Sequence, residues 1–119
     1  MKNYSEMSDF EINLAVAHIV IGSGGYDWNS DKKEVYLSAR DGGEFLPNAY
    51  FDPCNNPSDA WKITSENMIS ICAYKRANPG MKSVSWWEAD YFGEHITRND
   101  NPLRAAMIVF LMMQEAKNG

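Results

Sequence analysis

Cysteine and long apolar runs are both scarce in this 119-residue sequence, and their scarcity excludes several protein classes. The two cysteines, Cys54 and Cys72, are too far apart in the chain to form a close-spaced metal-binding pair. We therefore expect two reduced thiols that pack as small apolar side chains. The longest apolar run, residues 105–113, is shorter than the roughly 20 residues that a membrane-spanning helix needs. Because the N-terminal stretch is polar and acidic, unlike a secretory signal, we expect a cytoplasmic protein without a membrane segment.

Basic residues are also fewer than acidic ones. The sequence holds 16 acidic and 11 basic residues, so its net charge is −5. Binding to phosphates requires clustered lysine and arginine, and the longest basic cluster is Lys75 and Arg76, followed after a turn by Lys82. Non-specific binding to nucleic acid or to acidic membranes is therefore not expected. The negative charge is too mild to identify a nucleic-acid mimic, which we keep as an alternative.

Recognisable catalytic and metal-binding motifs are missing as well. The glycine-rich residues 22–25 lack the G-K-[ST] of a phosphate-binding loop and the G-x-G-x-x-G of a dinucleotide fold, so we expect a turn there. His18 and His95 have no cysteine or serine signature beside them. We predict no catalytic residue, no cofactor and no metal site. Asp52 and Asp59 are the only candidates for paired acids. Their expected roles are in capping and turns, and a small hydrolase or nuclease that uses them is kept as an alternative.

The strongest positive feature of the sequence is its last helix, predicted over residues 101–117. Asn101 suits the N-cap and Pro102 suits the first helical position. The apolar run covers every side of this helix, which is typical of a buried helix and not of a surface one. We therefore predict that it forms the core, with Met107 and Phe110 almost fully buried.

Two further helices are predicted from their start signals. Ser8 and Glu11 form a capping box before a helix over residues 9–19, whose apolar side chains recur at Phe10, Leu14 and Ala17. Asn56 caps a second helix over residues 57–66. There we expect Asp59 to reach back to the cap, and Asn67 to end the helix in a left-handed conformation.

Alternating apolar and polar residues predict the strands. Strands are expected at residues 33–39, 68–74 and 83–92, with a weaker edge strand at 44–51, a turn at 40–43 and a polar connection at 95–100. The order of elements favours a single α+β domain over residues 1–119, with an antiparallel sheet of three to four strands and about three helices on one face.

Arg104 and the Trp86–Trp87 pair are the most informative candidates for a binding site. Arg104 lies near the third position of the last helix, where the helix dipole disfavours a cation. It either covers apolar surface, pairs with an acid, or contacts an anionic ligand or a partner carboxylate. Adjacent strand residues point to opposite faces, so one tryptophan is expected on a surface or pocket wall, where it can stack on a base or anchor a partner.

We predict that these residues line one polar cleft with an aromatic wall. In that cleft Arg104 lies within reach of Asp52, Asn55 or Asp59, and two helix N-termini favour an anion. The predicted ligand-binding residues are Asp52, Asn55, Asn56, Asp59, Trp61, Trp86, Trp87, Asn101 and Arg104.

Three separated blocks resemble the NinX-type proteins of lambdoid phages. They read Y-S-E-M-S-D-F-E-I-N from residue 4, C-N-N-P-S-D-A-W from residue 54, and N-D-N-P-L-R-A-A-M-I-V-F-L-M-M-Q-E from residue 99. Lys62 stands where the family usually has a proline. The resemblance implies a small accessory protein of a temperate phage or prophage, made in the cytoplasm of the bacterial host, and it implies no biochemical activity.

The favoured function is therefore a non-enzymatic binding protein. Its expected partner is a host protein or a small anionic ligand such as a signalling nucleotide, with counter-defence as one purpose and a homodimer as an open alternative. The sequence does not identify the ligand or the target.

Overall fold

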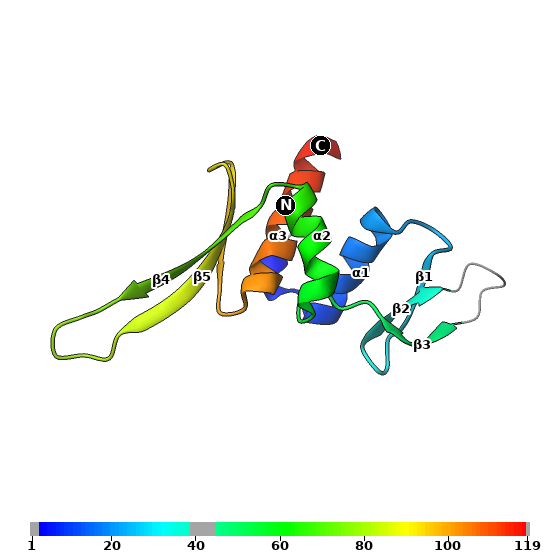
Figure 1. Ribbon diagram of the computed structural model, residues 1–119, viewed down its shortest axis with the longest axis horizontal. Coiled ribbons are helices and arrows are strands. Elements are labelled where there is room, and N and C mark those ends of the chain that lie inside the picture. The colour runs from blue at the N-terminus through cyan, green and yellow to red at the C-terminus, as the bar shows by residue number, and fades with distance from the viewer. Residues whose placement is uncertain (1–2, 39–44, 119) are drawn as a thin grey trace.

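A layer of helices separates two small sheets in the computed structural model, which describes residues 3–38 and 45–118 (Figure 1). The helical elements are a 3-10 turn η1 (Tyr4–Glu6), α1 (Asp9–Val20), α2 (Pro57–Glu66) and α3 (Pro102–Asn118). The strands are β1 (Tyr26–Asn29), β2 (Glu34–Ser38), β3 (Phe45–Tyr50), β4 (Ser70–Arg76), β5 (Val84–Tyr91) and β6 (His95–Asn99). The molecule is elongated, with extents of 60 × 31 × 25 Å.

The helices begin where their capping residues predict. Ser8 and Glu11 form the reciprocal capping box of α1, and the side chain of Asn56 accepts a hydrogen bond from the backbone N–H of Ser58 in α2. Asn101 Oδ1 accepts from the N–H groups of Leu103 and Arg104, at 2.9 and 3.2 Å, and so caps α3. These contacts satisfy N–H groups that the first helical turn leaves without a partner.

Helix α3 forms the core, as the sequence predicts. Residues 105–111 are all buried, and Met107 and Phe110 are 0% and 2% exposed. Helices α1 and α2 pack on α3, as does one face of the sheet β4–β5–β6. Among the described residues, no helix is both long and apolar enough to cross a lipid bilayer.

The strands form two antiparallel sheets of three strands each, in the orders β1–β2–β3 and β4–β5–β6. In the second sheet Ala89 lies opposite both Ile71 and Thr97, and Ala89 is fully buried against the helical layer. Alternation of side chains therefore places Glu88, Cys72 and Arg98 on the opposite face. The α+β class and the central position of the last helix are confirmed, and the described strands are divided between two antiparallel sheets of three strands each.

Two strands were missed because their turn signals are unusual. Residues 95–99, predicted as a polar connection, are strand β6, which pairs with β5 through a turn at Phe92 and Gly93. Both turn residues have positive φ, 47° and 78°, and a phenylalanine there hides the hairpin, which usually shows Asn or Asp before Gly. The short strand β1 directly follows the glycine-rich residues 22–25, which we predicted only as a turn.

Several local predictions are also corrected. Helix α2 ends at Glu66 with Asn67 as its C-cap, but the residue in the left-handed conformation is Met68, with a φ of 57°, and not Asn67, whose φ is −99°. Asp59 does not reach back to the cap, since its carboxylate instead accepts the backbone N–H of Asp52 at 2.9 Å. Helix α1 buries Ile12, Asn13, Val16 and Ala17, a face rotated from the predicted one. The turn predicted at residues 40–43 lies outside the described residues.

Candidate functional site

Arg104 lies at the centre of a polar cluster between helices α1 and α3. Its Nη1 donates to Asp9 Oδ1 at 2.7 Å, and its Nη2 donates to the backbone carbonyls of Ser5 and Met7. The side chain of Arg104 is only 13% exposed, whereas that of Asp9 is 43% exposed. The dipole penalty at this helix position is therefore offset by an ion pair and two carbonyl contacts.

Asn55 and Asn13 connect this ion pair to the chain before α2. Asn55 Nδ2 donates to Asp9 Oδ2 at 3.1 Å and to the carboxylate of Asp52 at 3.1 and 3.3 Å. Asn13 is buried; its Nδ2 donates to Asp52 Oδ1 at 2.8 Å and its Oδ1 accepts the N–H of Cys54 at 3.1 Å. A single hydrogen-bonded network thus joins the starts of α1 and α3 to residues 52–55.

Asn101 completes the network from the α3 side. Besides capping its own helix, it donates through Nδ2 to the carbonyl of Cys54 at 2.8 Å and to Asn55 Oδ1 at 3.2 Å. The structure therefore brings together five of the predicted residues, Asp52, Asn55, Asp59, Asn101 and Arg104, while Asn56 caps α2 beside them. Arg104 is linked to Asn55 through Asp9, which is not among the predicted ligand-binding residues.

The cluster is better suited to joining helices than to holding an anion. Arg104 is the cation of the network, and three carboxylates, those of Asp9, Asp52 and Asp59, take part in it. A neighbouring hollow of about 540 Å³ is lined by Asp9, Asp52 and Asn55 together with Phe10, Tyr50 and Phe51. An anion in that hollow would face the carboxylates of Asp9, Glu34 and Asp52 and a single cation, Lys33, whereas the guanidinium of Arg104 already has three acceptors.

The predicted tryptophans lie elsewhere. Trp61 is 70% exposed on α2, and Trp86 and Trp87 lie on β5 with their side chains on opposite faces of the sheet. Trp86 stacks on Tyr74 with ring centroids 5.8 Å apart, and the guanidinium of Arg98 lies 4.3 Å from the Trp86 ring centroid. The structure therefore does not place an aromatic wall of tryptophan beside Arg104.

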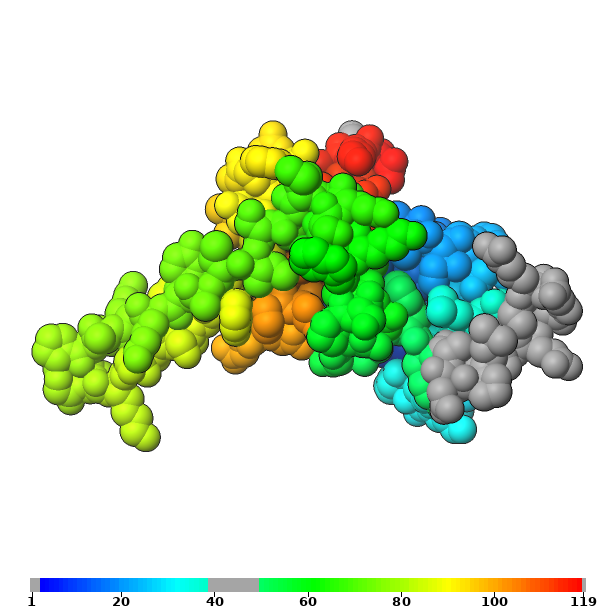
Figure 2. All heavy atoms as spheres, viewed as in Figure 1, coloured from blue at the N-terminus to red at the C-terminus, as the bar shows by residue number. Residues whose placement is uncertain are grey.

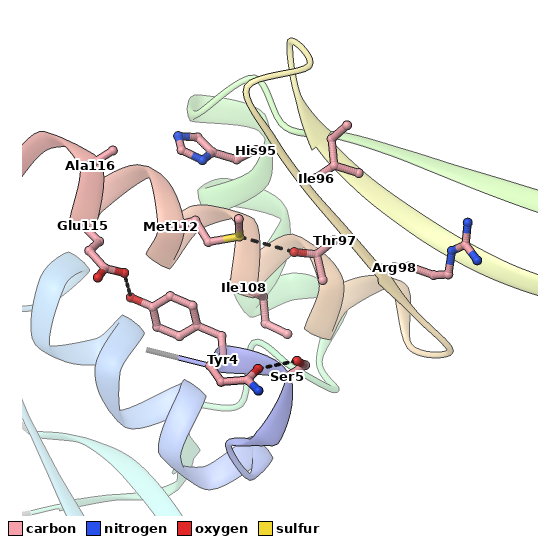
Figure 3. A pocket seen from close by; sticks show the side chains of 11 residues that line it. Tyr4, Ser5, His95, Ile96, Thr97, Arg98, Ile108, Met112, Glu115 and Ala116 are labelled. Carbon is pink, nitrogen blue, oxygen red and sulfur yellow. Dashed lines mark hydrogen bonds between the residues drawn. The ribbon is translucent and has the colours of Figure 1, made fainter. Parts of the chain in front are cut away.

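A groove of about 460 Å³ lies between η1, β6 and α3, and the sequence analysis missed it (Figure 3). Ile108 and Met112 of α3 form its apolar floor, and Tyr4 closes the side opposite β6. Its volume falls within the range of small-molecule and peptide pockets, roughly 300–1,000 Å³. The residues that line it are Asn3, Tyr4, Ser5, His95, Ile96, Thr97, Arg98, Ile108, Met112, Glu115 and Ala116.

Two side-chain contacts hold the walls of this groove in place. Tyr4 donates its hydroxyl to Glu115 Oε2 at 2.7 Å, and Thr97 donates its hydroxyl to the sulfur of Met112 at 3.4 Å (Figure 3). Burial and the hydrogen bond to the Glu115 carboxylate raise the pKa of Tyr4 to about 12. The groove therefore has one end fixed by a tyrosine–glutamate pair and one wall fixed to α3.

Strand β6 forms an edge of its sheet along this groove. Its inner edge pairs with β5, whereas no backbone hydrogen bond from another described segment reaches its outer edge. The N–H and C=O groups of such an edge are available to a further strand. The groove lies on the side of β6 where that strand would be added, above the apolar floor of Ile108 and Met112.

The sequence contained only a weak signal for this site. The alternation of Ile96 and Arg98 with His95 and Thr97 is the pattern of a strand, but five residues without a standard turn are too few to identify one. Within the described ranges, no three histidine, cysteine or acidic side chains meet in an arrangement that would hold a metal ion.

Comparisons with known proteins give one match. The family described as bacteriophage P22 NinX matches residues 3–114. No curated protein and no solved structure matches the chain.

Proposed function

Because the chain belongs to the bacteriophage P22 NinX family, we propose that it is a non-enzymatic phage accessory protein that binds an extended segment of a host protein. The setting of this function would be the cytoplasm of the bacterial host, where the phage protein is made, and counter-defence is one purpose it would serve. The bound segment would lie in the groove between β6, η1 and α3.

The observation that carries this proposal is the unpaired outer edge of β6 beside an apolar floor. An extended peptide that adds to a sheet edge gains affinity from main-chain hydrogen bonds and specificity from pockets for alternate side chains. Here the edge of β6 supplies the main-chain groups, and Ile108 and Met112 supply an apolar pocket. These features fit a protein segment better than a small anion.

The contacts of Arg104 also favour a host protein over a small anionic ligand. Its guanidinium is engaged by Asp9 and by two backbone carbonyls, so an anionic ligand would have to displace them. Asp52 and Asp59, the acids of the hydrolase alternative, accept hydrogen bonds from Asn13, Asn55 and the backbone of residue 52. In this arrangement both acids fix the chain between α1 and α2.

Filling the groove tests the proposal. Ala116 is an exposed residue that lines the groove, so Ala116→Trp should block it without disturbing the core. The matched control is Ser65→Trp, which places the same side chain at an exposed position of α2 outside the groove. Each tagged variant would be expressed in the bacterial host and its bound proteins identified by mass spectrometry and quantified.

We expect the wild type and Ser65→Trp to retain the same host protein, and Ala116→Trp to lose it by about tenfold or more, equivalent to about 1.4 kcal/mol of binding free energy. Equal retention by Ala116→Trp would contradict the groove as the site. The absence of any specifically retained protein with the wild type would contradict the function itself.

A further inference from the structure

The β4–β5 hairpin extends beyond the rest of the molecule as a two-stranded arm (Figures 1 and 2). Strand β6 pairs with β5 only as far as Trp87, opposite Asn99. Beyond that point β4 and β5 continue through three further residue pairs, the last of which is Arg76 opposite Val84. We call residues 73–87 the hairpin arm. Three residue pairs and the turn project it by roughly 10 Å or more past the third strand.

The charge of the hairpin arm is opposite to that of the rest of the chain. Lys75, Arg76 and Lys82 lie in it, all exposed, and it contains no acidic residue. All 16 acidic residues and eight of the 11 basic residues lie outside it. The nearest acid along β5 is Glu88, at the base of the arm, roughly 13 Å along the strand from Val84. Because exposed charges are screened over about 8 Å at physiological ionic strength, the acidic body does not cancel the positive tip.

Apolar side chains accompany this positive charge. Met81 and Val84 are 75% and 51% exposed, and Trp87 is also exposed near the base of the arm. The stack of Tyr74, Trp86 and Arg98 lies on the same face of the ribbon as Val84 and stiffens it, and Glu88 accepts hydrogen bonds from Trp86 and Arg98 at 2.8 and 3.4 Å. An isolated two-stranded ribbon is marginal in water, so this stack is a reason for the arm to hold its shape.

We propose that the hairpin arm is a second docking surface, whose occupant is an acidic face of the protein partner. This inference rests on the proposed function, since it assigns a surface chemistry to the host protein. Lys75 and Arg76 are adjacent in β4 and so lie on opposite faces of the ribbon. Carboxylates of the partner would pair with these two side chains and with Lys82 around the end of the arm, and Met81 and Val84 would contact apolar surface of the partner. Methionine, aromatic residues and arginine are enriched in the cores of protein interfaces, as they are on this arm.

A protein occupant is favoured over nucleic acid by the number of cations. Non-specific binding to nucleic acid relies almost entirely on release of counterions, and three contacts would give a salt dependence of only about −2.7 in log–log slope. The exposed apolar side chains of the arm contribute little to phosphate contacts but much to a protein interface.

A binding titration with a defined acidic polypeptide tests this proposal. The probe is fluorescently labelled poly-L-glutamate, titrated at low ionic strength with the wild-type chain and with two triple variants. The arm variant carries Lys75→Gln, Arg76→Gln and Lys82→Gln. The charge-matched control carries Lys32→Gln, Lys62→Gln and Lys117→Gln, at exposed positions outside the arm.

We expect the arm variant to bind poly-L-glutamate about tenfold more weakly than the wild type, as three exposed charge pairs together predict. The control should bind within about twofold of the wild type, since only charges away from the arm are changed. Equal loss in both variants, or no binding by the wild type, would overturn the arm as the surface. Arm-dependent binding of a DNA oligonucleotide of equal charge that is tighter than binding of poly-L-glutamate would overturn the protein occupant in favour of nucleic acid. If the wild type and the control associate with themselves and the arm variant does not, the occupant of the arm would be a second copy of the chain and not a host protein.

The same titration separates this inference from the proposed function. Ala116→Trp fills the groove and leaves the arm unchanged, so it should bind poly-L-glutamate as the wild type does. Loss of the host protein by Ala116→Trp together with unchanged binding by the arm variant would leave the groove intact as a site and overturn the arm alone.

Discussion

At the residue scale, two arginines with acidic partners show how burial decides what an ion pair contributes. Arg104 is 13% exposed and has three acceptors, whereas Arg98 is 64% exposed and pairs with Glu88 at 3.4 Å. Replacing Arg104 by alanine leaves Asp9 Oδ1 and the carbonyls of Ser5 and Met7 without their donor, while Asp9 Oδ2 keeps that of Asn55. Because Asp9 is partly exposed, we expect Arg104→Ala to lower the free energy of unfolding by about 2 kcal/mol, less than the roughly 3–5 kcal/mol of a fully buried pair.

Urea unfolding measures this difference. Arg104→Lys should recover only part of the loss, because an ammonium group cannot reproduce the planar fork that serves several acceptors. The control Arg98→Ala should cost less than about 1 kcal/mol. Equal costs for Arg104→Ala and Arg98→Ala would show that the Arg104 cluster does not hold the helices together.

Because of Tyr4, the free energy of unfolding is expected to fall at alkaline pH. Its pKa is raised from 10.0 to about 12 by burial and by its hydrogen bond to Glu115. The unfolded chain therefore loses the tyrosine proton first, so the stability that Tyr4 contributes should be fully present below about pH 10 and be lost between about pH 10 and 12. Burial also raises the pKa of Cys54, from 9.0 to about 12, so this thiol lowers the stability in the same direction from about pH 9 upward.

Unfolding measured at pH 8, 10 and 11 tests the contribution of Tyr4. Tyr4→Phe should flatten the fall in stability, and Glu115→Gln should reduce it because the carboxylate supports the raised pKa. The part that persists in Tyr4→Phe belongs to Cys54 and Tyr36, whose pKa values are also raised by desolvation. A fall of the same size in Tyr4→Phe and in the wild type would contradict this origin.

The sequence identified Arg104 as an unusual residue, but it did not identify Asp9 as its partner. A cation at the start of a helix breaks a local rule, and this correctly marked a residue with special contacts. Asp9 lies 95 positions earlier in the chain, so only the packing of α1 against α3 brings the two together. Asn13 was missed for the same reason, since its partners are in the chain before α2.

At the scale of elements, the two asparagine caps differ in what else they contact. Asn56 accepts one hydrogen bond, from Ser58, whereas Asn101 accepts two in its own helix and donates to Cys54 and Asn55. Asn56→Ala should therefore cost about 1 kcal/mol, as a plain cap does. Asn101→Ala should lower the free energy of unfolding by about 2 kcal/mol or more, because it also leaves the carbonyl of Cys54 without its donor.

Thermal and urea unfolding of the two variants test this ranking. Asn101→Asp is a useful companion because it keeps the capping oxygen and removes the amide donor. We expect its stability to lie between those of the wild type and Asn101→Ala. A larger cost for Asn56→Ala than for Asn101→Ala would contradict the link between α3 and residues 54–55.

The elements that carry standard signals were predictable from sequence. Capping boxes, prolines at the first helical position and apolar runs located α1, α2 and α3 to within one or two residues. Alternation located β2, β4 and β5. The strands β1 and β6 are short, and the turn before β6 has Phe92 where a standard hairpin has Asn or Asp, so neither was recognised.

At the scale of the whole molecule, the candidate site depends on relations that no local pattern records. The groove joins η1, β6 and α3, three segments from both ends of the chain. Its polar edge exists because β6 lies at the outside of its sheet, and its floor is formed by Ile108 and Met112 of α3. The projection of the hairpin arm likewise follows from the early end of β6. Sequence located the basic residues and tryptophans but not the surfaces that they form.

Amide hydrogen exchange of the free and partner-bound protein is the most direct test of the central claim, that a host protein segment pairs with the edge of β6. In the free protein, the outward-pointing amides of His95–Asn99 have no partner among the described residues and should exchange rapidly. In the complex these amides should become protected, while those of α2 should exchange at unchanged rates. The account would be contradicted if the partner binds while the β6 amides stay unprotected and protection is confined to the Arg104 cluster or to α2.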